Sequence, residues 1–171
     1  PGTTVFTGDN TYQGGTLISC GTLLANNSTG SALGSGTATV TNLGVLGGSG
    51  TVTSATVTRG GTISPGASST NLANLTVTSL TFGEGATYLW QVGAATGTAG
   101  VNWDLITVDS WSDLASSANP VTIKVDSQGV IPTGWNAGTA RDWVILQPGN
   151  NYGFNASDFA LDTTAFIGNV Q

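Results

Sequence analysis

Histidine is absent from the sequence, and only three residues are positively charged. Without an imidazole the chain has no Ser-His-Asp or Cys-His nucleophile, no histidine base and no histidine ligand for zinc or iron. Its cations are Arg59, Lys124 and Arg141, and nine acids bring the net charge to −6. Three scattered cations form neither a patch that tracks phosphates nor one that binds an anionic bilayer. We therefore expect no nucleic-acid partner and no membrane insertion.

Other absences narrow the class of protein further. No apolar run approaches the roughly 20 residues of a membrane-spanning helix. Glycine clusters such as residues 47–50 are not followed by the Gly-Lys-Ser/Thr of a phosphate-binding loop, so we expect neither a nucleotide nor another cofactor. Cys20 is the one cysteine, which rules out an internal disulfide. We expect its side chain to be buried in a strand, the alternative being a bridge between two copies.

What the chain does contain points to a folded protein outside the cell. Of its 171 residues 39% are hydrophobic and only 7% charged, against about 25% charged in typical globular domains. Thr, Ser, Asn and Gly must then form most of the surface. Five tryptophans and many short aliphatic runs supply a β-forming core. The chain begins at Pro1 without Met, and we expect it to be part of a longer exported precursor.

Short runs in which apolar and hydroxyl residues alternate dominate the sequence. Such alternation predicts strands with one buried and one wet face. The predicted strands are residues 16–20, 22–25, 37–41, 51–58, 62–64, 75–82, 87–92, 105–109, 121–126 and 143–147. Residues 111–118 are the best helical candidate, and we expect no more than a single turn there because Asn119-Pro120 follows.

A glycine followed by threonine and an aliphatic residue recurs at positions 15–17, 21–23, 50–52 and 61–63. A brief strand returning after each glycine is typical of a coiling β-solenoid. An antiparallel sandwich is the alternative, but its hairpins favour Asn-Gly or Asp-Gly turns, and neither dipeptide occurs. We therefore predict parallel pairing between residues 4 and 92. The side chains predicted to point inward are Leu17, Leu23, Val40, Val52, Val57, Ile63, Leu75 and Val77.

The composition changes near residues 94–100, after which most tryptophans and aspartates occur. We predict one β-solenoid domain over residues 1–171, with regular coils in residues 1–93. Residues 101–171 are predicted to form wider, aromatic-rich coils or a cap. Bulky rings and charges at a solenoid end cover its core and its strand edges.

Residues 8–16 and 21–23 read GDNTYQGGT and GTL. This string resembles the autotransporter-associated β-strand repeat, as do the GGTISPG of residues 60–66 and the WDLITV of residues 103–108. The resemblance implies an all-β fold, a right-handed parallel β-helix, in a large secreted or surface-anchored bacterial protein. It implies a scaffold and no catalytic residues. Within the motif we expect Asn10 to bond to backbone at a corner, Tyr12 to cover the adjoining coil and Gly14-Gly15 to allow a tight bend.

Paired carboxylates are the one catalytic route left to a chain without histidine. The candidates are Asp104, Asp109, Asp113, Asp126 and Asp142, with Trp111 lying between two of them as a possible sugar platform. We interpret these acids as flanking turns and Trp111 as core. None fits a calcium-loop spacing. We predict no catalytic, cofactor-binding or metal-binding residues.

The sequence thus predicts a non-enzymatic structural module of the cell surface or of a secreted protein. One alternative is an adhesin or glycan-binding module that exposes Trp103, Trp111 and Trp135. The weakest alternative is a glycan-active enzyme with paired aspartates. Asp9 is the only charge in residues 2–49, so the N-terminal edge is poorly defended against strand pairing. We expect either head-to-tail assembly into a homo-oligomer or filament, or ends covered by neighbouring domains of a precursor.

Overall fold

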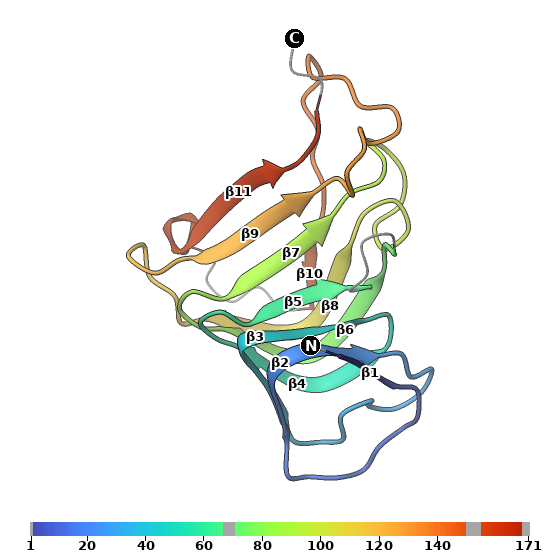
Figure 1. Cartoon of the computed structure of the whole chain (residues 1–171), viewed down its shortest axis with the longest axis vertical. Helices are drawn as coiled ribbons and strands as arrows, with labels where there is room; N and C mark the ends of the chain where they lie inside the picture. The colour runs from blue at the N-terminus through green and yellow to red at the C-terminus, as the bar shows by residue number, and fades with distance from the viewer. Residues whose placement is uncertain (1, 67–70, 150–154, 169–171) are drawn as a thin grey trace.

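The structure, a computed structural model, describes residues 2–66, 71–149 and 155–168 (Figure 1). It consists almost entirely of strands in one curled sheet. The strands are β1 (Thr3–Phe6), β2 (Thr16–Ala25), β3 (Thr37–Gly48), β4 (Thr51–Val57), β5 (Thr62–Pro65), β6 (Asn74–Phe82), β7 (Thr87–Gln91), β8 (Leu105–Asp113), β9 (Val121–Asp126), β10 (Leu146–Pro148) and β11 (Phe159–Ala165), with one 3-10 helix, η1 (Ala156–Asp158). In the described part of the chain no helix is long and apolar enough to cross a membrane.

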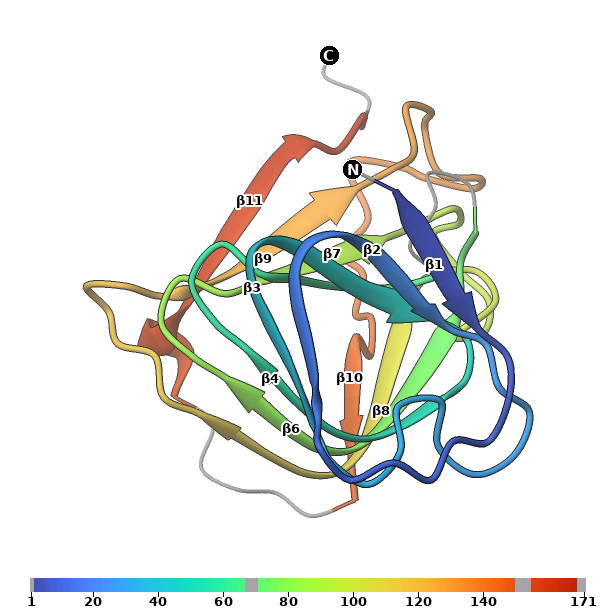
Figure 2. The same cartoon turned by 60° about the horizontal axis from the view of Figure 1, so that its bottom comes forward.

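Every ladder between these strands is parallel, and each joins a strand to one a coil away. The fold is therefore a parallel β-helix, as predicted, and Figure 2 shows its coils as stacked, roughly triangular loops. Side A consists of β1, residues 22–25 and 45–48, β5, β7, β9 and β11. Side B consists of residues 16–18, 37–40, 54–57, 79–82 and 110–113. Side C consists of residues 51–52, 74–77 and 105–108 and β10.

The coils widen toward the C-terminus. On side A, Thr3 pairs with Thr22, a step of 19 residues. Near the other end Thr87 pairs with Thr122 and Thr122 with Ala160, steps of 35 and 38 residues. The prediction of wider coils in the C-terminal half agrees with these steps.

Much of this extra length lies between side A and side C. Residues 49 and 50 alone join β3 to β4, whereas residues 92–104 join β7 to β8 and residues 127–145 join β9 to β10. The narrow and the wide end of the molecule thus differ in the perimeter of their coils. Figure 1 shows the result as a body that broadens from β1 and β2 toward β9 and β11.

The size of the inward side chains explains the taper. On side B one inward column runs from Ala38 through Ala55 and Leu80 to Trp111, each paired with the next. All four are buried. Because interiors are close-packed, a column that grows from alanine to tryptophan pushes the opposite sides of the coil apart.

The motif residues of the first coils have the structural roles expected of them. The Nδ2 of Asn10 donates to the carbonyl oxygen of Ala32 one coil away, at 2.8 Å. Gly15 has a φ of 75°, and a Cβ there would lie 2.8 Å from the carbonyl oxygen of Thr37. The hydroxyl of Tyr12 lies 2.7 Å from the hydroxyl of Thr16.

Three predictions are corrected by the structure. Leu17 is 69% exposed, because it pairs with the outward Thr39 and leaves the inward position to Ile18. Cys20 is exposed, not buried, because it lies just beyond a register shift at the corner between sides B and A. The helical candidate begins inside strand β8, where Trp111 pairs with Leu80. The other residues predicted to point inward are buried.

Candidate functional site

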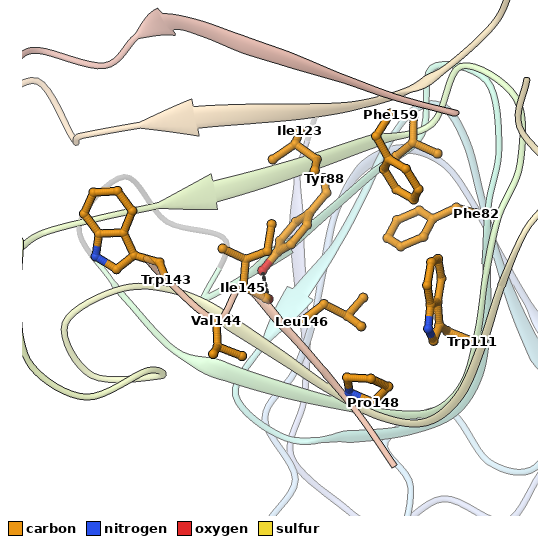
Figure 3. A pocket seen from close by; sticks show the side chains of 11 residues that line it. Phe82, Tyr88, Trp111, Ile123, Trp143, Val144, Ile145, Leu146, Pro148 and Phe159 are labelled. Atoms are coloured by element: carbon orange, nitrogen blue, oxygen red, sulfur yellow. Dashed lines mark hydrogen bonds between the residues drawn. The ribbon is translucent and has the colours of Figure 1, made fainter. Parts of the chain in front are cut away.

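The wide end of the solenoid holds an apolar pocket of about 480 Å³ (Figure 3). Its walls come from sides A and B and from the segment that leads into β10. The described lining residues are Phe82, Tyr88, Trp111, Val121, Ile123, Trp143, Val144, Ile145, Leu146, Pro148 and Phe159. None of these carries a formal charge, so the pocket suits packing against apolar groups.

Two hydrogen bonds hold the segment before β10 against the strands. The hydroxyl of Tyr88 donates to the carbonyl oxygen of Ile145 at 2.8 Å, and Figure 3 shows this bond across the pocket. The indole Nε1 of Trp103 donates to the carbonyl oxygen of Val144 at 3.1 Å. Burial, and then the charge of Asp104, raise the pKa of Tyr88 well above its usual value, so the phenol stays a donor at neutral pH.

The tryptophans of this region pack on one another. The rings of Trp90 and Trp143 are 5.5 Å apart, and Trp143 stacks on Trp135 at 6.0 Å. Trp103 and Trp111 are only 8% and 7% exposed. The exposed patch of Trp103, Trp111 and Trp135 that a glycan-binding module would need is therefore not formed.

Asp104 is the most deeply buried of the acids named from the sequence. It has no exposed surface. Its Oδ1 accepts from the backbone of Ala73 at 3.0 Å and its Oδ2 from the backbone of Gln91 at 3.1 Å. Burial raises its pKa from 3.8 to about 7, an effect the two hydrogen bonds oppose and the charge of Asp126 adds to. Asp104 thus joins the corner segments before β6 and β8 to the end of β7.

The remaining acids do not form the cleft predicted for an enzyme. Asp109 and Asp142 are exposed, on β8 and before β10. Asp113 lies beside Asp158, an acid the sequence reasoning missed, and burial and this neighbour raise the pKa of Asp113. Carboxyl groups that hydrogen bond directly are closer than the about 5–9.5 Å that glycoside hydrolysis requires. No group of three or more metal-binding side chains occurs among the described residues.

Pairing across coils explains why some of these residues were missed. Asp158 belongs to η1, just before β11, a strand whose alternation is weak in the sequence. The lining of the pocket combines residues from Phe82 to Phe159, which only the coil register brings together. Their shared signal is the aromatic enrichment of the C-terminal half.

Residues 1–25 match the family model of the passenger-associated-transport-repeat. This stretch contains the GDNTYQGGT and GTL strings, and the resemblance to the autotransporter-associated repeat is confirmed there. No curated protein and no solved structure matches the chain. The first coil of the solenoid therefore carries a passenger-associated module.

Proposed function

We propose that the chain is an exported, non-enzymatic structural module, a tapered β-helical section of a bacterial surface or secreted protein. The observation that carries this proposal is the continuous apolar core. It runs from Ile18 at the narrow end to Val125 near the wide end without an intervening cleft of polar groups in the described residues. A rigid rod of stacked coils is the product of such a sequence.

The match of residues 1–25 to a passenger-associated repeat supports export. The placement of the acids supports a structural role, because Asp104 bonds to backbone and Asp113 contacts Asp158. The burial of Trp103 and Trp111 supports the same role, since these rings fill the core instead of an exposed platform.

Association of copies belongs to this proposal. Side A ends in a parallel strand at both ends of the solenoid, β1 at the narrow end and β11 at the wide end. Head-to-tail contact would extend this one ladder from copy to copy. Sides B and C match less well, because coils of 19 and 38 residues differ in perimeter. The contact we propose is therefore confined to side A and weak.

Incubation of the purified chain with a panel of neutral and acidic glycans tests the non-enzymatic role. We expect no product, and we expect the chain to survive protease treatment that degrades an unfolded control. Asp113→Asn and Asp158→Asn should behave as the parent does. Turnover that disappears in either variant would show that this carboxyl pair is catalytic and would overturn the proposal.

A further inference from the structure

Side B presents two columns of hydroxyl groups to the outside. One column consists of Thr37, Ser54, Ser79 and Ser110, each paired with the next. The other consists of Thr39, Thr56, Thr81 and Ser112, paired in the same way. We call the surface formed by these eight residues the hydroxyl face. Figure 2 shows two of its strands, β4 and β6, side by side.

Burial alternates strictly along all four strands of this face. In β4 the inward Ala55 and Val57 are buried while Ser54 and Thr56 are partly exposed. The same alternation holds in the matching parts of β3, β6 and β8. No outward position in the two columns is aromatic, charged or purely apolar.

The hydroxyls form a regular two-dimensional array. Neighbouring coils repeat at about 4.8 Å, and the two columns are two residues apart on each strand, about 6.6 Å. The side chains are short, and threonine is stiff at χ1. Two contacts between coils order the array further: the hydroxyls of Thr37 and Ser54, and those of Thr81 and Ser112, both lie 3.2 Å apart.

The chemistry of this array excludes most classes of partner. It has no cations for nucleic acid or an anionic membrane. It also lacks the aromatic or arginine anchors on which protein interfaces depend. Uncharged hydroxyls both donate and accept, so they complement a surface of other hydroxyls. Threonine methyl groups add contact for the C–H faces of sugar rings.

We propose that the hydroxyl face binds insoluble, uncharged polysaccharide. The fixed repeat of the array favours an ordered glycan surface, on which many weak hydrogen bonds form at once. This binding goes beyond the structural role proposed above and depends on it only for the export that exposes the chain to such a surface. The aromatic residues at the wide end take no part in it.

Retention on microcrystalline cellulose, measured as a binding isotherm, tests the proposal. The double variant Thr56→Lys/Thr81→Lys places two charges on the hydroxyl face, which an uncharged surface does not pair. We expect about tenfold weaker binding. Thr62→Lys/Thr87→Lys is the matched control on side A, since these threonines also pair across coils and are also partly exposed. We expect this control to bind as the parent does, and raised NaCl to leave retention unchanged.

Thr56→Val/Thr81→Val removes the hydroxyls and keeps the shape, and we expect it to weaken binding as well. Circular dichroism establishes that each variant is folded. Failure of the parent to bind, or equal losses in the two lysine variants, would overturn the proposal. So would sedimentation showing that the hydroxyl-face variant alters association between copies. The glycan-turnover assay is separate, so a failure here leaves the structural role intact.

Discussion

Asp104 shows how one residue supports the widened coils. Within the described part of the chain it forms no salt bridge. Its carboxylate instead accepts two backbone N–H groups, those of Ala73 and Gln91. A corner that inserts extra residues leaves backbone donors without ladder partners, and buried donors of this kind must be satisfied. The aspartate of the WDLITV string is therefore explained as a corner staple and not as an acid catalyst.

The raised pKa of Asp104 predicts a decline in stability with rising pH. Its pKa is about 7 in the folded chain and 3.8 as the unperturbed value. Between these values the folded state binds more protons than the unfolded state, so the free energy of unfolding falls as pH rises and levels off above about 7. The fall amounts to roughly 4 kcal/mol at most. Urea unfolding at pH 4.5, 6 and 8 measures it.

Asp104→Asn should flatten most of this decline, because the amide does not titrate. Asp113→Asn is the comparison, since the pKa of Asp113 is also raised and contributes a fall of the same sign. Asp126→Asn should weaken the decline by removing the charge that repels Asp104. A parent chain as stable at pH 8 as at pH 4.5, with Asp104→Asn unchanged in slope, would contradict the assignment.

Gly34 and Gly14 predict opposite responses to the same substitution. Gly34 has a φ of 63° and is buried, and a Cβ there would overlap the carbonyl oxygen of Tyr12. Gly34→Ala should lower the free energy of unfolding by about 3 kcal/mol, from left-handed strain and steric overlap. A Cβ at Gly14 would meet no atom within 4 Å, and Gly14 has no positive φ, so Gly14→Ala should change stability by less than about 1 kcal/mol. Denaturant midpoints measure both, and equal effects would disprove the argument.

At the scale of the strands, the alternating runs predicted most of the fold. Val52, Val57, Leu75 and Val77 are buried as expected, because each lies in a run where hydroxyl residues mark the opposite face. Parallel pairing followed from the recurrence of glycine and from missing hairpin turns. Both signals are local, and a single sequence displays them.

The errors arose where register depends on other coils. Leu17 follows the same Gly-Thr pattern as Leu23, yet only Leu23 points inward. The difference is a register shift between Ile18 and Cys20, which shortens the repeat at a corner. Strands β1 and β11 were missed because each is the last of its ladder and has a weak pattern of its own. The pocket was missed because its walls meet only through coil stacking.

At the scale of the whole molecule, the two ends are unlike. The narrow end begins with β1, where the exposed Thr3 and Thr4 leave little apolar surface. At the wide end Leu161 of β11 pairs with the inward Ile123 and is 69% exposed. The edges there are partly defended, since β10 is three residues long and ends at Pro148. Short edge strands and proline limit the addition of further strands.

These ends predict weak, reversible association through side A. The edge strand β1 presents Val5, 48% exposed, and Asp9 is the nearest charge along the chain. We expect sedimentation to show monomers at low concentration and larger species as concentration rises, with short fibres by electron microscopy. Val5→Lys should abolish association, because an edge lysine opposes strand pairing. Leu43→Lys is the control, since Leu43 is 81% exposed on side B's corner with side A and lies away from both ends. A chain that stays monomeric at the highest concentration, or loses association equally in both variants, would show that copies do not meet through β1.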